Sequence, residues 1–182
     1  MLTGIREKGL SVLNWTSEAQ QLRLRLQCAA RWLPEEPWPA VDDATLLDEL
    51  ESWLLPHMTG VHSLRGLKSV DIYQALRDRL PWSLQQRLES SLPTHYTVPT
   101  GSQIAIRYDE DNPPALAVRM QEMFGEASTP TIAQGRVALV LELLSPAQRP
   151  LQITRDLSAF WQGAYREVQK EMKGRYPKHV WP

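Results

Sequence analysis

The sequence predicts an α+β protein, with a helical bundle over residues 1–93 followed by a small, mainly antiparallel β unit and a C-terminal helix over residues 94–182. Three observations lead to this prediction. Leucines recur at helical spacing through the first half, short β-like runs bounded by Gly and Pro fill much of the second half, and an amphipathic segment closes the chain. The pattern changes near Pro93, which marks the expected boundary.

The first of four expected helices begins at a capping box formed by Ser17 and Gln20 and ends at Pro34. Alternating leucines over residues 22–26 also permit a strand, but the Ala-rich continuation favours a helix. The apolar positions of this helix fall on one face, at Leu22, Leu26, Ala29 and Leu33.

The other three helices of the bundle are expected to begin at Asp43, Ser69 and Pro81. Asp43 and Ser69 are suitable N-caps, and proline fits the first turn of a helix because its missing N–H has no partner there. The apolar stripes are Leu46, Leu47, Leu50 and Leu54, then Ile72, Leu76 and Leu80, then Leu84, Leu88 and Leu92. Short helices with short joints favour a bundle.

A β-hairpin is expected at the start of the second half, with strands over residues 96–98 and 103–108. Pro99-Thr100-Gly101 forms its loop, since proline presets the first turn position and glycine accepts a positive φ. Two later strands are expected over residues 137–144 and 151–154.

Residues 116–124 are compatible with more than one element, and Gly125 as a stop signal favours a short helix. A last helix is expected from Thr154 or Asp156 to about Lys173, where Gly174 ends it. Its apolar positions are Leu157, Phe160, Trp161, Ala164 and Val168.

Charge is unevenly distributed along a chain whose net charge is only −1, so the protein is not a polycation that coats nucleic acid. Residues 32–64, here called the acidic block, contain no Lys or Arg and seven acids. The flanking regions carry an excess of basic residues. The acids are Glu35, Glu36, Asp42, Asp43, Asp48, Glu49 and Glu51.

The single cysteine, Cys28, excludes an internal disulfide and fits a reducing compartment. No signal peptide and no apolar stretch of about 18 residues is present, so we expect a cytoplasmic protein without a membrane partner. The chain begins with amphipathic residues and stops at Trp181-Pro182, and we expect it to be a fragment of a longer protein.

Catalytic and metal-binding motifs are absent or wrongly spaced. Gly66-Leu67-Lys68-Ser69 resembles the end of a phosphate-binding loop, but a residue separates the glycine from the lysine and no long apolar strand precedes it. His57 and His62 lack dense ligand spacing for a metal, and Cys28 has no histidine partner. Residues 109–111 are three consecutive acids beside two prolines, which is typical of a solvated turn. The sequence therefore predicts no catalytic residue, no metal and no cofactor in this chain.

Nucleic-acid binding has better support. Lys and Arg neutralise phosphates, and aromatic side chains stack on bases. The candidates are Arg107, Arg136, Arg166, Lys170, Lys173, Arg175 and Lys178. Three of them, at positions 166, 170 and 173, share one face of the last helix. The alternative is a solvated face on which Glu167 and Glu171 pair locally with these cations.

Several motifs resemble the C-terminal region of the HrpB family of bacterial ATP-dependent helicases, relatives of the DEAH-box helicases. They are Gly174-Arg175-Tyr176-Pro177-Lys178-His179-Val180-Trp181-Pro182, Leu54-Leu55-Pro56, Leu80-Pro81-Trp82, and Pro99-Thr100-Gly101-Ser102 with Ile104, Arg107 and Tyr108. The resemblance covers essentially the whole chain. Family proteins run further past the Trp-Pro ending, which also indicates a fragment.

The resemblance implies a non-catalytic accessory region. The parent would be an ATP- and Mg-dependent helicase, of 3′-to-5′ polarity, whose two motor domains lie N-terminal to this chain. In related helicases the accessory part contains a helical bundle and an OB-like β domain that help line a channel for single-stranded RNA or DNA. About four expected strands are few for a complete OB barrel.

Two other functions compete with nucleic-acid guiding. The acidic helix and the region of Trp38 and Trp53 are candidates for a protein-docking surface against the motor domains or another partner. A free-standing enzyme is the third, and every catalytic constellation considered for it fails on spacing.

Overall fold

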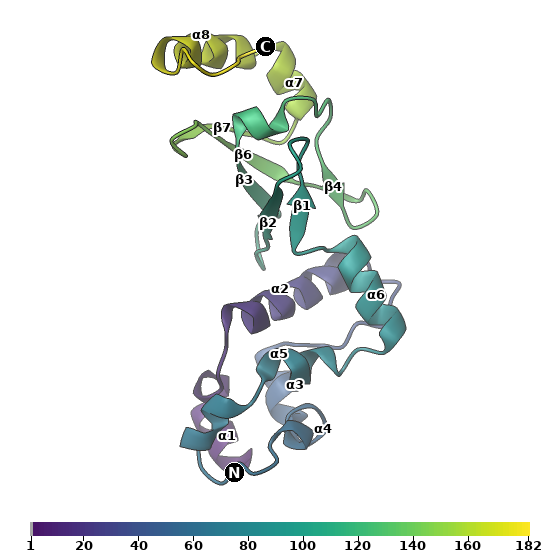
Figure 1. Ribbon diagram of the computed structural model, residues 1–182. Helices are drawn as coiled ribbons and strands as arrows, with labels where there is room; N and C mark the ends of the chain where they lie inside the picture. The colour runs from purple at the N-terminus through teal and green to yellow at the C-terminus, as the bar shows by residue number, and fades with distance from the viewer. Residues whose placement is uncertain (1) are drawn as a thin grey trace. The chain divides into compact units, whose positions relative to one another are not determined.

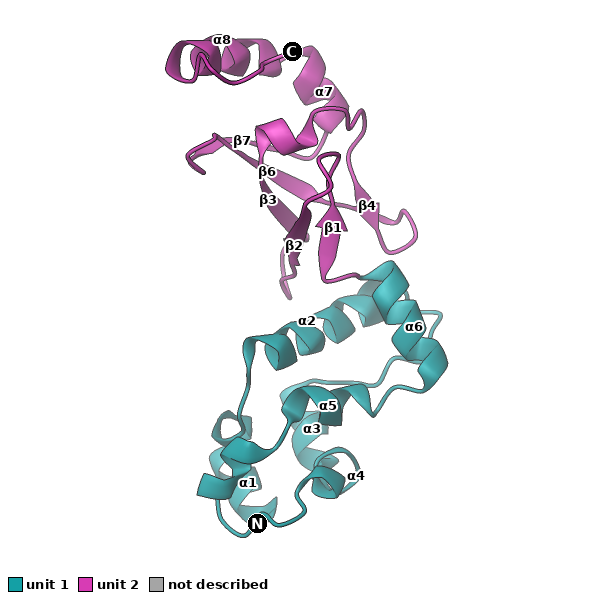
Figure 2. Cartoon of the chain, viewed as in Figure 1, with its two compact units in different colours: residues 1–92 teal, residues 93–182 magenta. Residues whose placement is uncertain are grey.

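The computed structural model describes residues 2–182, and the chain forms two compact units, residues 1–92 and residues 93–182 (Figure 2). The first unit, called unit 1, is helical, and the second, called unit 2, combines two sheets with two α-helices and a 3-10 helix. The α+β class predicted from the sequence is confirmed. The expected boundary at residue 93 lies next to the division between the units.

Unit 1 contains six α-helices and three short 3-10 helices among its described residues (Figure 1). The α-helices are α1 Leu2–Lys8, α2 Ser17–Trp32, α3 Asp43–Asp48, α4 Leu50–Trp53, α5 Ile72–Arg77 and α6 Trp82–Ser91. The 3-10 helices are η1 Leu10–Val12, η2 Leu55–His57 and η3 Arg65–Ser69.

The N-caps of unit 1 lie at other residues than predicted. Thr16, Asp42 and Asp71 accept hydrogen bonds from backbone N–H groups three residues on, at 3.1, 3.1 and 3.0 Å. The capping box of Ser17 and Gln20 was wrong, because Gln20 donates instead to the carbonyl of Trp15. Each true cap has extended backbone, as an N-cap requires.

The residues predicted at the helix starts, Asp43, Ser69 and Pro81, lie one, two and no positions from the observed N-caps Asp42, Asp71 and Pro81. Asp43 is already the first residue of α3, Ser69 ends η3, and Pro81 is the extended residue before α6. A side chain that can cap is found near each helix start, but only the backbone conformation selects which one does so.

The predicted helix from Asp43 to Leu54 is divided at Glu49, whose φ and ψ of −102° and 23° are not helical. The indole N–H of Trp53 donates to the carbonyl of Leu46 at 2.8 Å. A continuous helix would pair that carbonyl with the N–H of Leu50. Burial of the Trp53 ring therefore accompanies the break.

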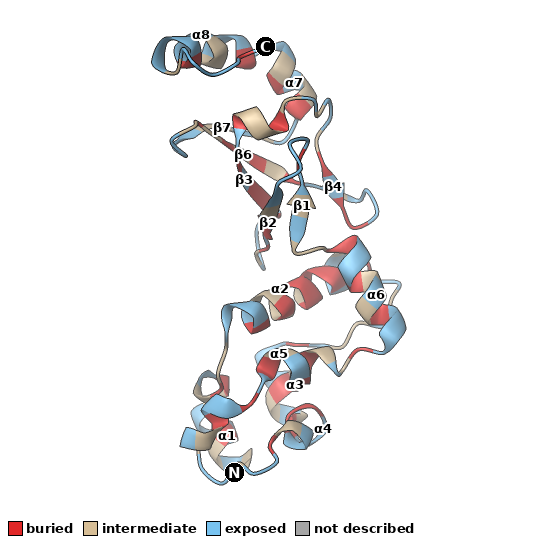
Figure 3. Cartoon of the chain, in the orientation of Figure 1, coloured by how far each residue is buried: buried red, intermediate tan, exposed pale blue. Residues whose placement is uncertain are grey.

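The core of unit 1 is built from the predicted apolar stripes together with residues of α1 (Figure 3). Leu26, Leu33, Leu46, Leu50, Leu54, Leu76 and Ile5 are 0% exposed. Burial of an aliphatic side chain of this size contributes about 1.5–3 kcal/mol before entropy is subtracted. The leucine periodicity thus identified the buried faces correctly even where helix ends were misplaced.

Unit 2 is built on a five-stranded sheet with order β1-β2-β3-β6-β7 and a separate pair β4-β5. The strands are β1 His95–Thr97, β2 Gln103–Arg107, β3 Ala115–Arg119, β4 Thr131–Ile132, β5 Val137–Ala138, β6 Val140–Leu144 and β7 Pro150–Thr154. The β3–β6 pair is parallel and the other pairs are antiparallel. The sheet is mainly antiparallel, as predicted, and an OB-like fold stays a prediction, since β1 and β7 form no pair within residues 2–182.

Two element predictions in unit 2 were wrong. Residues 116–124 form β3 and the 3-10 helix η4 Met120–Met123 rather than one helix, because alternate burial of Leu116 and Val118 fits a strand. The run over residues 137–144 is divided between β5 and β6, which belong to different sheets. Leu139 lies between them and is fully buried, and its backbone N–H donates to the carbonyl of Pro130.

The last predicted helix is interrupted at Gly163, which gives α7 Leu157–Gln162 and α8 Tyr165–Arg175. Gly163 has a non-helical conformation, and its N–H donates to the carbonyls of Ala159 and Phe160. Glycine is a weak helix former, which makes it the natural place for a break. Gly174 does not end α8, which continues to Arg175.

Candidate nucleic-acid interface

Helix α8 presents the clearest candidate surface, here called the basic face: Arg166, Lys170 and Lys173. Tyr165 and Met172 are buried at 8% and 0% exposure and fix the inner side of the helix. The three cations of the basic face are exposed, and their spacing of four and three residues places them on one side of the helix.

No ion pair involves these three side chains within residues 2–182. The expected alternative, local pairing with Glu167 and Glu171, is therefore not seen on the basic face.

Arg175 lies on a different side of α8. It is two positions beyond Lys173, which turns it by about 200° around the helix axis. Its Nη1 lies 3.8 Å from an oxygen of Glu171, one turn earlier. Arg175 is 60% exposed in its side chain, so this pair is a solvent-screened contact of at most about 0.5 kcal/mol.

The segment after α8 folds back and holds the helix in place. The hydroxyl of Tyr165 donates to the carbonyl of Pro182 at 2.7 Å, and the amide of Gln169 donates to the carbonyl of Trp181 at 2.8 Å. Trp181 is 5% exposed. Burial raises the pKa of Tyr165 above its ordinary value. Lys178 lies exposed in this returning segment.

Arg107 forms an ion pair with Glu142 on the surface of the sheet. Both of its terminal nitrogens approach Glu142, with Nη1 at 3.2 Å from Oε1. Register places Arg107 opposite Ala115 on β3, and Glu142 opposite Ala117 on the same strand. The short alanine side chains let the guanidinium reach across β3. The hydrogen bonds that Arg107 donates to the Glu142 carboxylate raise the pKa of Arg107, whose side chain remains 62% exposed.

The predicted cations do not form one continuous cluster. Arg107 is the last residue of β2, and Figure 1 shows that this end of the sheet points away from α8. Arg136 is exposed and is the last residue of the β4–β5 turn, in which Ala133, Gln134 and Gly135 all have positive φ. The structure therefore brings together the basic face on α8 and leaves Arg107 and Arg136 on other parts of unit 2.

Arg119 is a further surface cation that the sequence reading missed. It lies on β3 two positions beyond Ala117, so it shares the sheet face of Arg107 and Glu142. Its Nε is 3.9 Å from a carboxylate oxygen of Glu122. The alternation of apolar and polar residues from 115 to 119 is the signal that would have identified it, had that segment been read as a strand.

Other motifs singled out in the sequence have structural roles. Cys28 is fully buried, and Asp109 accepts hydrogen bonds from the N–H groups of Asp111 and Asn112, which lower its pKa and form a turn. The residues of the loop-like motif at 66–69 form η3, where Ser69 donates to the carbonyl of Gly66. His57 lies 3.2 Å from Asp78.

No group of three metal-ligating side chains occurs among residues 2–182. None of the helices described there has the length and apolar character required to traverse a bilayer.

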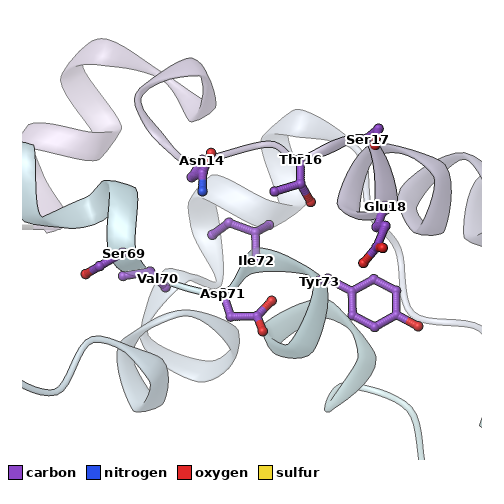
Figure 4. A pocket seen from close by; sticks show the side chains of 9 residues that line it. All are labelled: Asn14, Thr16, Ser17, Glu18, Ser69, Val70, Asp71, Ile72 and Tyr73. Carbon is purple, nitrogen blue, oxygen red and sulfur yellow. The ribbon is translucent and has the colours of Figure 1, made fainter.

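A polar pocket of about 480 Å³ lies between the start of α2 and the start of α5 (Figure 4). Glu18 and Asp71 both line it, together with hydroxyl groups of Thr16, Ser17 and Ser69. One oxygen of Asp71 already caps α5. None of the predicted nucleic-acid-binding cations lines this pocket, so it is separate from the basic face.

Comparison with known proteins relates the chain to the HrpB helicases. A family model for the C-terminal region of ATP-dependent helicases, HrpB_C, matches residues 53–182. The ATP-dependent RNA helicase HrpB of Escherichia coli (strain K12) is 84% identical over 182 residues, which are 100% of this chain and 22% of that protein. The chain thus spans about a fifth of the length of this relative.

Two solved structures share the fold. The crystal structure of the E. coli DExH-box NTPase HrpB superposes with a TM-score of 0.99 at 84% identity, over 100% of this chain and 22% of that one. The crystal structure of the Escherichia coli DEAH/RHA helicase HrpB gives a TM-score of 0.88 at 82% identity, over 100% and 23%.

Proposed function

The chain belongs to the HrpB C-terminal helicase family, and from this membership we propose that it is a non-catalytic accessory region that guides single-stranded RNA or DNA to the motor domains of an ATP-dependent helicase. The observation that carries the proposal is the basic face of α8. Its three cations are exposed and point along one side of a helix whose other side is anchored by Tyr165 and Met172.

Phosphate contact is the interaction that such a face offers. Exposed Lys and Arg release counterions from a nucleic-acid backbone, and they read no sequence. We therefore propose weak, sequence-independent binding. Lys178 and Arg136 add secondary contacts. Arg107, Arg119 and Arg175 contribute less, because each is already close to a carboxylate.

The motor domains of the parent protein are the second proposed partner. ATP and Mg would bind there, and this chain would supply no catalytic group to the reaction. The E. coli relative carries the name of an RNA helicase, which makes RNA a natural first substrate to test. A cytoplasmic location is part of the same proposal.

Docking through the acidic block has less support. Trp53 is 2% exposed and Trp38 is half-buried, and the indole N–H of each donates to a carbonyl of unit 1. The acids also serve internal contacts: Glu51 with Arg6, Asp43 with Arg23, Glu49 with Arg79 and Glu36 with Arg87, at 2.7, 2.5, 2.6 and 3.4 Å.

The proposal is tested by changing Arg166, Lys170 and Lys173 together to Gln in the full-length protein that contains this chain. Fluorescence anisotropy with a single-stranded oligonucleotide is measured from low to raised salt. We expect binding to weaken about tenfold at low salt, and the salt slope to fall by about 2, since each lost phosphate contact removes about 0.7 on a single strand.

A matched control removes three exposed cations from unit 1 through Lys8→Gln, Arg65→Gln and Lys68→Gln. The net charge changes equally, so any effect of overall charge appears in both variants. Equal binding by the two triple variants would exclude the basic face as the contact surface.

A further inference from the structure

An aromatic pocket of about 360 Å³ opens beside the first residue of α8. Three rings line it: Phe124 follows η4, Trp161 lies on α7, and Tyr165 begins α8. Glu126 and Pro182 complete the wall. This volume lies at the small end of the usual range for ligand pockets, about 300–1,000 Å³.

The three rings meet without face-to-face stacking. Trp161 and Tyr165 are 5.1 Å apart at 84°, Phe124 and Tyr165 are 5.9 Å apart at 74°, and Phe124 and Trp161 are 5.7 Å apart at 46°. Edge-to-face packing fixes the orientation of the rings and leaves part of their faces uncovered. A flat aromatic ligand could therefore find a wall to stack on.

Hydrogen bonds hold the polar edges of these rings. The indole N–H of Trp161 donates to the carbonyl of Glu126 at 2.7 Å, and the hydroxyl of Tyr165 donates to the carbonyl of Pro182 at 2.7 Å. The rings are thus oriented before any ligand arrives, which lowers the entropy cost of binding.

From this arrangement we infer that the pocket receives one unpaired nucleobase of the strand whose phosphates contact the basic face. The inference rests on the proposed function. Tyr165 lines the pocket and Arg166 is the next residue of the same helix, so a base in the pocket places its backbone beside exposed cations. Base stacking on aromatic side chains tolerates any sequence, as the proposed function requires.

The negative charge of Glu126 favours a base over a phosphate in the pocket. Glu126 lines the pocket, and its carboxylate accepts a hydrogen bond from the hydroxyl of Tyr96 at 3.2 Å. Burial, with the nearby Glu126 charge, raises the pKa of Tyr96. A carboxylate disfavours phosphate and leaves the space to an uncharged base, while the basic face attracts the backbone.

The test compares a single-stranded oligonucleotide with an abasic backbone of the same length, both binding to the full-length protein, by anisotropy over a range of salt. We expect the wild type to bind the base-bearing strand at least fivefold more tightly, since stacking on one base is worth that factor or more. Trp161→Leu should weaken binding of the base-bearing strand and leave binding of the abasic backbone and its salt slope unchanged.

Trp82→Leu is the matched control, because Trp82 is 70% exposed on α6 and lies outside the pocket. An unchanged salt slope for Trp161→Leu also shows that α8 is still folded. A second measurement needs no variant: 2-aminopurine in the strand should lose fluorescence on binding to the wild type and lose less on binding to Trp161→Leu.

The outcomes separate the two proposals. If the strand binds with the α8-dependent salt slope but Trp161→Leu binds it like the wild type, the pocket holds no base and the guiding function stands. The same holds if a proline-rich peptide, or another part of the full-length protein, fills the pocket and the strand does not compete with it. If changing the basic face has no effect either, both proposals fail.

Discussion

Arginines of unit 1 and cations of α8 have the same charge and opposite surroundings. In unit 1, the Nε atoms of Arg6, Arg23 and Arg25 donate to the backbone carbonyls of Leu47, Val41 and Leu92 at 3.0, 2.7 and 2.7 Å. On α8, the basic face contacts solvent. A count of basic residues along the sequence cannot distinguish the internally bonded arginines of unit 1 from the exposed cations of α8. Only the cations of α8 leave their charge available to a ligand.

The acidic block explains the difference. Four of its seven acids pair with arginines of unit 1, so that much of this unit's positive charge is neutralised within the fold. Arginine suits this role, because its planar fork can bind a carbonyl and a carboxylate together, as Arg6 and Arg23 do here. Three of the five basic residues from 166 to 178 belong to the basic face and have no such partner within residues 2–182.

Arg25→Ala tests whether the internal arginines stabilise unit 1. Arg25 is 1% exposed, and besides its bond to the Leu92 carbonyl it lies 3.3 Å from Glu89. The substitution removes a buried side chain and the partner of a carbonyl, and we expect it to lower the free energy of unfolding by about 3 kcal/mol. Urea unfolding and hydrogen exchange of the α2 amides measure this loss.

Arg65→Ala is the control, because Arg65 is exposed on η3 and a surface change of this kind costs at most about 0.5 kcal/mol. Nucleic-acid binding should be unaffected in both variants where the protein is folded. A loss below about 1 kcal/mol for Arg25→Ala would mean that the internal arginines of unit 1 do little for its stability.

The fold could be predicted from the sequence where local periodicity decides it. Leucine spacing located the buried faces of α2, α5 and α6, and the Pro99-Thr100-Gly101 loop located the first hairpin, in which Gly101 has φ +93°. Long-range packing decided the rest. The division of residues 137–144 depends on which strands lie beside it, and Ala115 to Arg119 pair with Val140 to Leu144 from far along the chain.

The candidate site was only partly accessible to sequence reasoning, for the same reason. Helical spacing alone placed Arg166, Lys170 and Lys173 on one face. The pairing of Arg107 with Glu142 could not be predicted, since it requires the register of three strands and two alanines between them. The aromatic pocket brings Phe124 to Trp161 and Tyr165, from elements about forty residues apart, and no local pattern indicates it.

Arg107 is the residue of unit 2 that most resembles the arginines of unit 1, because a carboxylate of the same unit pairs with it. Glu142→Gln removes its charged partner, and we expect binding of a single strand to strengthen about twofold to threefold at low salt, in keeping with the small energies of exposed ion pairs. Glu110→Gln removes the same charge from an exposed loop and is the control. If both variants strengthen binding equally, net charge is the cause and Arg107 has no specific part.

The smallest expected effect concerns an acid of unit 1 that acts as a helix cap. Asp42 accepts hydrogen bonds from the hydroxyl and the N–H of Thr45, at 2.7 and 3.1 Å, and these lower the pKa of Asp42 below its ordinary value. Because the folded state binds this proton less readily than the unfolded state, the cap stabilises α3 fully above the unfolded pKa of about 3.9. Its contribution disappears as the pH falls through the lower folded-state pKa.

Asp42→Asn tests this assignment, since asparagine keeps a capping oxygen and does not titrate. Urea midpoints measured at pH 7 and near pH 3 should differ less in this variant than in the wild type, whereas Asp48→Asn, an exposed acid at the far end of α3, should leave the difference as it is. An equal acid sensitivity of all three proteins would place the titrating groups elsewhere. The charge of Asp42 would then contribute nothing to the acid sensitivity of unit 1.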